Sequence, residues 1–191
     1  MTKENTKGKG LFLKEGMKKF KTHGALFPSS KFLGERMLKH VDMGEEVCIV
    51  ELGAGTGAFT KQIIKRLPAS GKLIVFEINP AMIVFLKEII QDPRVIIIEG
   101  DAKHIKRHLN EIVVTKVDYV ISGLPLGNFS KKDIQEILAS ISESIGTDGV
   151  YLQFQYLMAS LLQIKKVFDT KIVGYEYRNL PPAFIYKCKN K

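Results

Sequence analysis

The chain has 191 residues, of which 45% are hydrophobic and 26% are charged, and it carries a formal net charge of +9. This composition is typical of a globular protein with a buried core, and it excludes wholesale disorder and the collagen-like and disulfide-framework classes. Cys48 and Cys188 lack the spacing of a metal or redox site, which predicts reduced thiols in a cytoplasmic protein. No apolar run approaches the ~20 residues of a membrane span, so any membrane contact is expected to be peripheral.

The positive charge is concentrated near the N-terminus. Residues 1–44 hold ten basic and four acidic side chains, which is +6 of the net charge. Such a segment favours a polyanionic partner, either nucleic acid or an anionic lipid surface, although a solvated basic tail has the same composition. We expect a basic tail and helical cap over residues 1–44 and one ligand-binding domain over residues 45–191.

Two helices are predicted within this first segment. Leu13, Met17 and Phe20 recur at helical spacing beside lysines, which predicts a short basic amphipathic helix over residues 11–23. After a turn at residues 24–30, Ser29 or Ser30 is placed to cap a second helix over residues 31–40. The amphipathic helix is suited to an anionic membrane, and its alternative role is to cover a ligand pocket.

From residue 45 onward, short β-branched runs alternate with helical patterns, which predicts a doubly wound, mostly parallel α/β sheet. No helix separates the last two strands, so they are expected to form an antiparallel pair. The predicted strands cover residues 47–52, 72–77, 95–99, 117–122, 149–154, 171–177 and 183–186, and the predicted helices cover residues 58–67, 81–90, 131–144 and 157–168.

A glycine-rich loop follows the first predicted strand. Residues 51–57 read Glu-Leu-Gly-Ala-Gly-Thr-Gly, directly before a predicted helix. Glycines let the backbone turn tightly and approach a ligand closely. A carboxylate such as Glu51 suits a ligand with a cationic end better than a phosphate. The motif resembles the first motif of class I S-adenosylmethionine-dependent methyltransferases, although a generic glycine turn has the same residues.

The next two strand ends support this resemblance. Glu77 closes the second strand, where an acid can accept hydrogen bonds from two ribose hydroxyls. Asp101 and Ala102 follow the third strand and resemble the segment that contacts adenine in these enzymes. The resemblance implies a Rossmann-like fold and S-adenosylmethionine as cofactor. It places the cofactor on Glu51, Gly53, Gly55, Gly57, Glu77, Ile78, Asp101 and Ala102.

The fourth strand end is expected to face the methyl acceptor. Residues 122–126 read Ser-Gly-Leu-Pro-Leu. Adenine N6-methyltransferases and ribosomal RNA dimethylases carry a polar residue and an aromatic residue here, which hold and stack a flipped base. This chain has Gly123 and Leu126 at those two positions, so both base-holding groups are missing. Phe129 is the remaining candidate for stacking.

A closer resemblance covers roughly residues 10–187. The segments 24–30, 122–126, 153–156 and 177–183 are together similar to small bacterial phospholipid N-methyltransferases. That family methylates phosphatidylethanolamine, which implies a phospholipid substrate and an anionic membrane surface as partners. The alternatives are an RNA or DNA adenine methyltransferase and a non-catalytic S-adenosylmethionine-binding module. The sequence does not predict the oligomeric state.

Acceptor-side residues follow from this resemblance and from their chemistry. Tyr156, at the fifth strand end, is the candidate for orienting the amine, and its ring suits a methylated cation. Arg178 is the candidate for the lipid phosphate because its planar fork matches phosphate oxygens. His104 and His108 lack a third ligand, so no metal site is expected. The other predicted residues are Ser122, Gly123 and Leu124 at the reacting end, and Asn179, Ser29 and Ser30 for substrate.

Overall fold

The structure, a computed structural model, describes residues 30–191. The predicted amphipathic helix at residues 11–23 and the predicted substrate residue Ser29 lie outside the described residues. Among residues 30–191, no helix has the length and apolar character required to cross a bilayer.

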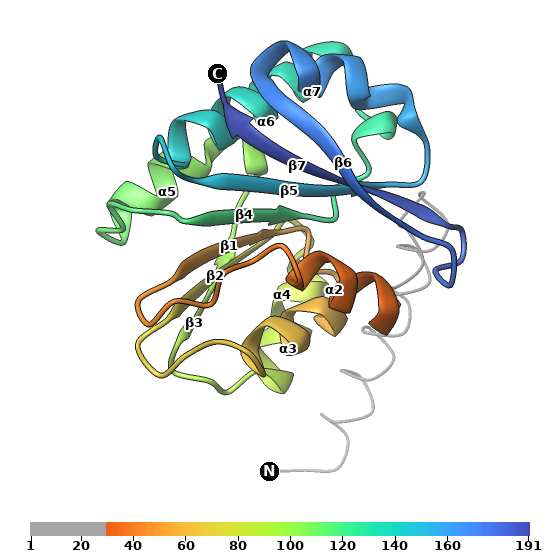
Figure 1. Cartoon of the computed structure of the whole chain (residues 1–191). Helices are drawn as coiled ribbons and strands as arrows, with labels where there is room; N and C mark the ends of the chain where they lie inside the picture. Colours follow the sequence, from red (N-terminus) through yellow and green to blue (C-terminus); the bar gives the residue numbers. More distant parts are fainter. Residues whose placement is uncertain (1–29) are drawn as a thin grey trace.

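A single seven-stranded sheet with the order β3-β2-β1-β4-β5-β7-β6 forms the centre of the structure (Figure 1). Strand β7 pairs antiparallel with both β5 and β6, and the other described pairings are parallel. The predicted sheet and its antiparallel terminal pair are therefore confirmed. The strands are β1 (Cys48–Leu52), β2 (Lys72–Glu77), β3 (Val95–Glu99), β4 (Tyr119–Ser122), β5 (Val150–Gln155), β6 (Phe168–Glu176) and β7 (Ala183–Asn190).

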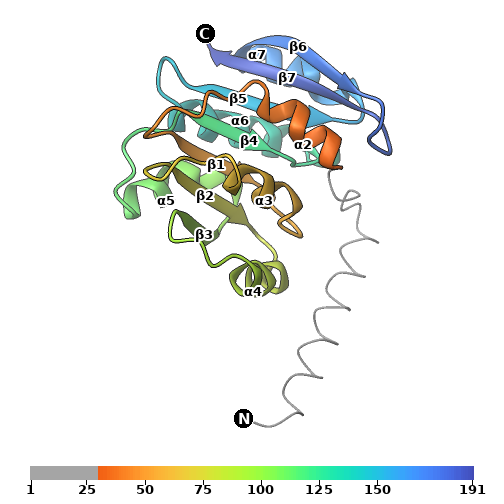
Figure 2. The same ribbon diagram turned by 60° about the horizontal axis from the view of Figure 1, so that its bottom comes forward.

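Helices cover both faces of this sheet (Figures 1 and 2). Successive strand residues point to opposite faces, so Ile49 packs in one core cluster and Val50 in the other. One cluster contains side chains of α2 (Lys31–Leu38), α3 (Ala58–Ile64) and α4 (Pro80–Ile89). The other contains side chains of α5 (Ile105–Glu111), α6 (Lys131–Ser144) and α7 (Leu161–Val167).

The boundaries differ from the predicted ones in a few places. Helix α5 was not predicted, because its seven residues bury only Ile105 and Leu109 and show little periodicity. The predicted helix over residues 157–168 is shorter, since Leu157 has an extended backbone and Phe168 starts β6. Short 3-10 turns complete the set: η1 (Ala102–His104), η2 (Leu126–Asn128) and η3 (Met158–Ser160).

A buried carboxylate connects α2 to the turn between β6 and β7. Glu176 ends the edge strand β6, yet its side chain has no exposed surface, because two arginines cover it. Arg178 donates from Nε and Nη2 at 2.8 and 3.0 Å, and Arg36 Nε donates at 3.1 Å. The Arg178 guanidinium also lies 4.1 Å from the centre of the Phe32 ring. These contacts hold the start of the described chain against its last turn.

We expect Glu176→Gln to lower the free energy of unfolding by about 1–2 kcal/mol at pH 7, because two arginines lose a charged partner. The hydrogen bonds from Arg178 hold the pKa of Glu176 down at about 2, against the opposing effect of burial. This stabilisation is complete above the carboxyl's ordinary pKa of 4.5 and is lost as the pH falls toward 2. Denaturant titrations should therefore show the difference from wild type shrinking between pH 7 and pH 3.

Glu35→Gln is the matched control, because Glu35 lies on the same helix in an exposed pair with Lys31 at 3.6 Å. It should change stability by less than about 0.5 kcal/mol. Equal effects of the two substitutions would contradict the assigned role of Glu176.

Candidate functional site

The glycine-rich loop lies where the parallel strands end on one edge of the sheet, which is the usual ligand edge of such folds. Gly53, Gly55 and Gly57 have φ angles of 75°, 54° and 72°, in the left-handed region that favours glycine. A Cβ at Gly57 would also meet Leu86 at 2.8 Å. The loop therefore needs glycine for its backbone path and for its approach to α4.

Glu77 fixes the conformation of this loop. Its Oε2 accepts a hydrogen bond from Gly55 N at 2.9 Å, and its Oε1 accepts from Ile78 N and Asn79 N, each at 2.9 Å. The Glu77 residue is only 4% exposed. Three backbone donors thus converge on one carboxylate, which ties the end of β2 to the loop after β1. The side chain of Ile78 is 65% exposed beside it.

Glu51 is the second buried acid of the site. It is 3% exposed, and its Oε2 has no hydrogen-bond partner among residues 30–191. Burial, together with the charge of Glu77, raises the pKa of Glu51 to about 7. A buried carboxylate oxygen without a partner is costly. It fits a ligand that supplies a cationic or N–H group, as the amino acid end of S-adenosylmethionine does.

Asp101 and Ala102 lie after β3, as predicted. Asp101 Oδ1 caps η1 by accepting from Lys103 N at 2.9 Å, and about a third of its side chain is exposed. Lys103 Nζ lies 3.8 Å from Asp101 Oδ2 and donates to Asp133 at 2.9 Å. Ala102 is 7% exposed. The capping contact uses Oδ1, so Asp101 Oδ2 has only the distant Lys103 Nζ as a described partner.

At the end of β4 the chain makes a tight, internally bonded turn. Ser122 Oγ accepts from Leu124 N at 3.1 Å, so the serine hydroxyl supports the turn. A Cβ at Gly123 would lie 3.2 Å from the ring of Phe154, which is closer than ordinary packing. Leu126 is fully buried in the core cluster of α5, α6 and α7.

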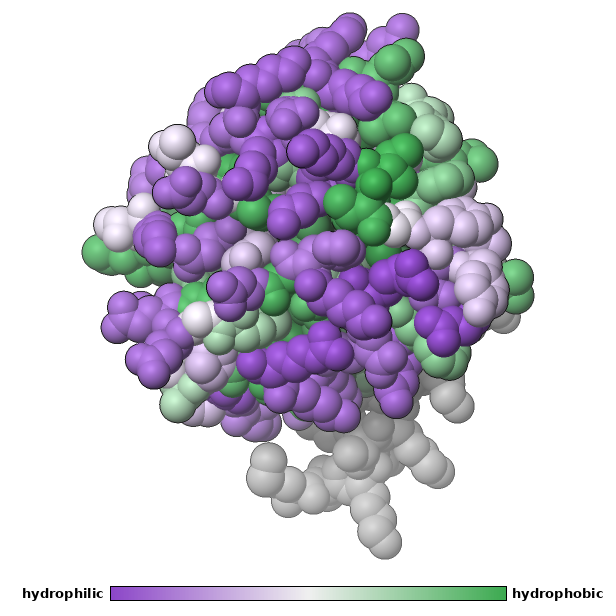
Figure 3. All heavy atoms as spheres, in the orientation of Figure 1, coloured by the Kyte–Doolittle hydropathy of each residue, from purple (hydrophilic) through white to green (hydrophobic). Residues whose placement is uncertain are grey.

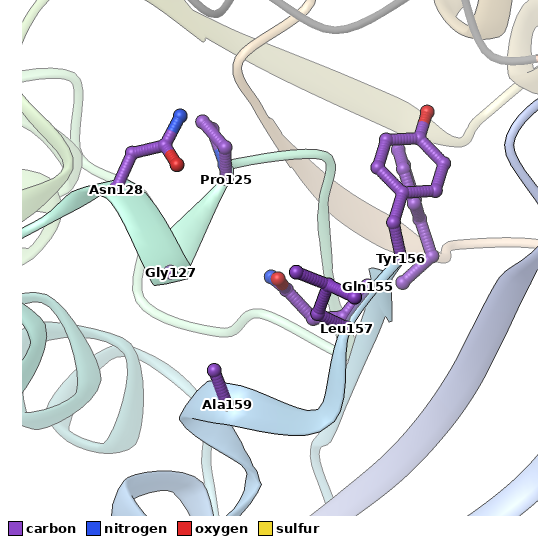
Figure 4. A pocket seen from close by; sticks show the side chains of 8 residues that line it. Pro125, Gly127, Asn128, Gln155, Tyr156, Leu157 and Ala159 are labelled. Carbon is purple, nitrogen blue, oxygen red and sulfur yellow. The ribbon is translucent and has the colours of Figure 1, made fainter.

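A pocket of about 200 Å³ opens beside this turn (Figure 4). Its walls come from η2 on one side and from the end of β5 and η3 on the other. The Phe154 and Tyr156 rings pack edge to face with centres 5.8 Å apart. The Tyr156 hydroxyl is buried without a partner among the described residues. The lining residues are Pro125, Gly127, Asn128, Phe154, Gln155, Tyr156, Leu157 and Ala159.

Sequence reasoning predicted Tyr156 in this pocket but not Gln155, Asn128 or Leu157. The spacing of Gln153 and Gln155 on β5 is the signal that places two glutamine side chains together at the strand end.

The predicted substrate residues at the last turn contact one another. Asn179 is 2% exposed; its Oδ1 accepts from Ser30 N at 2.9 Å and its Nδ2 donates to the Pro181 carbonyl at 2.7 Å. Ser30 Oγ caps α2 by accepting from Leu33 N at 3.2 Å. The Arg178 guanidinium is bound to Glu176, as described above. Among residues 30–191, no cluster of three His, Cys, Asp or Glu side chains forms a metal site.

Comparison with known proteins identifies the family. A family model described as "Methyltransferase domain" matches residues 49–149. The ornithine lipid N-methyltransferase of Singulisphaera acidiphila is 30% identical over 177 residues, which are 90% of this chain and 92% of that protein. The ribosomal RNA small subunit methyltransferase A of Mycoplasma mycoides subsp. mycoides is 33% identical over 113 residues. That match spans 57% of this chain and only 40% of the relative.

Solved structures share the fold. Human N-acetylserotonin methyltransferase in complex with SAM (S-adenosylmethionine) has a TM-score of 0.62 at 16% identity. The match covers 82% of this chain and 51% of that one. The fold, the glycine loop and the length of the family match agree: the chain belongs to the methyltransferase-domain family and is a class I S-adenosylmethionine-dependent methyltransferase.

Proposed function

We propose that this methyltransferase N-methylates the primary amine of a membrane lipid, either phosphatidylethanolamine or an ornithine lipid. The observation that carries the proposal is the packing of the turn after β4. Leu126 is part of the core, and the Phe154 ring occupies the space beside Gly123 that a base-holding side chain would need. A flipped nucleobase would find neither of the groups that hold it in adenine methyltransferases.

Apolar side chains at the same edge support a lipid. Leu157 at the pocket is 74% exposed, and Tyr177 and Leu180, in the turn between β6 and β7, are 68% and 78% exposed. Hydrophobic residues also interrupt the polar surface over β6 and the segment after β5 (Figure 3). Exposed apolar groups of this kind are suited to acyl chains or to a bilayer surface. The full-length similarity to an ornithine lipid N-methyltransferase agrees with this assignment.

In this proposal the two buried acids bind different parts of the cofactor. The orphan oxygen of Glu51 faces the cationic amino acid end, beside Gly53, Gly55 and Gly57. Glu77 and the adjacent Ile78 contact the ribose, and Asp101 with Ala102 contacts the adenine. Bound S-adenosylmethionine supplies an activated methyl group on a sulfonium sulfur, and the protein's residues align the acceptor with it.

The acceptor amine must lose a proton before its lone pair can react. Burial raises the pKa of Tyr156, so its hydroxyl stays protonated at neutral pH and orients the amine without acting as a base. The rings of Phe154 and Tyr156 offer faces to a methylated cation. Ser122, Gly123 and Leu124 shape the reacting end through the tight turn described above.

The lipid headgroup is assigned to the last turn and the cap. Arg178 is the candidate for the phosphate of a phospholipid through the part of its guanidinium that Glu176 does not bind. Asn179 and Ser30 support the position of Arg178 by joining the turn to α2. Ser29, outside the described residues, stays a predicted substrate residue. The basic segment over residues 1–44 is assigned to an anionic membrane surface at the inner face of the membrane.

Ribosomal RNA is the second candidate substrate, because relatives that methylate it match 57% of the chain and Phe129 is 37% exposed.

One assay distinguishes the lipid substrate from the RNA substrate. Protein is incubated with methyl-labelled S-adenosylmethionine and vesicles of phosphatidylethanolamine, vesicles containing ornithine lipid, or ribosomal RNA. Label is expected in the chloroform extract of one lipid arm, and label in RNA alone would overturn the proposal.

We expect Glu77→Ala to weaken S-adenosylmethionine binding by about 1–3 kcal/mol, because three backbone donors and the proposed ribose contact lose their acceptor. Isothermal calorimetry measures the change. Glu99→Ala is the matched control, since Glu99 ends the adjacent strand but is exposed. Unchanged affinity in Glu77→Ala would refute the assignment.

The affinity for S-adenosylmethionine should also depend on pH. A cationic ligand favours the ionised form of Glu51, whose pKa of about 7 leaves it mostly protonated at lower pH. Binding should therefore release a proton and strengthen roughly tenfold between pH 5.5 and pH 7. Glu51→Gln, which keeps the shape, should bind more weakly and with a flat profile over this range. The same slope in both proteins would exclude Glu51 as the titrating group.

A further inference from the structure

The chain segment after β4 is held by the carbonyl oxygen of Leu124, which accepts two side-chain hydrogen bonds. Gln153 Nε2 lies 3.1 Å from this oxygen and Gln155 Nε2 lies 3.0 Å from it. The two glutamines are two positions apart on β5, so their side chains leave the strand on the same face. A carbonyl oxygen has two lone pairs, and both are used here. The Leu124 carbonyl is therefore already saturated and is a poor partner for a substrate amine.

Both polar atoms of the Gln153 amide form hydrogen bonds within the protein. Its Nε2 also donates to the Phe154 carbonyl at 2.6 Å, and its Oε1 accepts from the Tyr151 hydroxyl at 2.5 Å. The residue has no exposed surface. Gln153 is therefore a support of the turn, with no polar atom left for a ligand.

Gln155 differs from Gln153 at its oxygen. Because its partner is a carbonyl, the amide must turn its NH2 group toward Leu124, and this fixes the direction of Oε1. Oε1 accepts no hydrogen bond within residues 30–191, although Gln155 is only 7% exposed. The side chain is part of the pocket wall, between Asn128 and Tyr156 (Figure 4). An amide oxygen that lines a pocket and has no protein partner is free to accept from an N–H donor that enters the pocket.

We propose that Gln155 Oε1 accepts a hydrogen bond from the N–H of the acceptor amine and so orients its lone pair. The inference rests on the proposed lipid amine substrate and adds a specificity-determining contact to it. An amide oxygen is neutral and very weakly basic, so Gln155 holds the amine without removing its proton. Its hydrogen bond to the fixed Leu124 carbonyl keeps the amide from rotating.

The hydrogen bond to Gln155 Oε1 can form only while the headgroup nitrogen carries an N–H group. A primary ammonium headgroup has three N–H groups and a trimethylated headgroup has none. Gln155 therefore contributes to the binding of the unmethylated lipid and contributes nothing to the binding of the fully methylated product. This difference favours entry of the substrate and release of the product.

The test compares two soluble short-chain lipids, dihexanoyl phosphatidylethanolamine and dihexanoyl phosphatidylcholine, by calorimetry in the presence of S-adenosylhomocysteine. Gln155→Leu should weaken binding of the first about tenfold and leave binding of the second unchanged. A short-chain ornithine lipid provides the other source of the amine and should behave as the first lipid does. Equal losses for all lipids, or no loss for either amine, would overturn the inference.

Two further variants serve as a control and as an alternative to Gln155→Leu. Gln91→Leu makes the same substitution at an exposed glutamine and should change neither affinity. Gln155→Asn, whose shorter amide does not reach the same positions, should show the same lipid ranking if the leucine variant does not fold. The proposed lipid methylation fails separately, when the wild type transfers no label to either lipid. In that case the inference falls with it.

Discussion

The conformation of the glycine-rich loop after β1 depends on one buried carboxylate. Glu77 accepts three backbone hydrogen bonds at 2.9 Å and joins the end of β2 to the glycine loop that follows β1. The left-handed glycines provide the path of the loop, and the carboxylate selects one conformation among those that glycine permits. A side chain that already accepts three backbone hydrogen bonds is held in place before any ligand arrives, so little reorganisation accompanies binding. Glu51 complements it with an oxygen that has no partner among residues 30–191.

The pocket beside the turn after β4 is organised around an amide and carbonyl network rather than around charge. Gln153, Gln155 and Leu124 fix the turn after β4, while Phe154 and Leu126 fill the volume that a base-holding site would use. The Phe154 ring has two roles: it fills the space beside Gly123, and it lines the pocket.

Much of the fold, and the acids at the strand ends, could be predicted from the sequence, because the patterns that specify them are local. The strands β2 and β3 and the helix α6 match their predicted bounds, and the acids at the ends of successive strands lie on one edge as parallel topology requires. The contacts that were not predicted join distant parts of the chain. Arg36 meets Glu176 across 140 residues, and Gln155 meets Leu124 across 31. No periodicity specifies such pairs, so Gln155 received no role. Glu176 lies only two residues before Arg178, but its burial depends on the distant Arg36 as well, and it was not predicted as a partner of Arg178.

The two cysteines have a practical consequence for work on this protein. Burial raises the pKa of Cys48 to about 11 and that of Cys188 to about 12, and neither thiol forms a disulfide. Thiolate is the reactive form, so both native thiols should be nearly inert to maleimides at neutral pH. Since the sequence has only these two cysteines, a single cysteine introduced at an exposed position becomes the preferred site of labelling. Fluorescent or spin probes can therefore be attached at the apolar edge without first removing the native thiols.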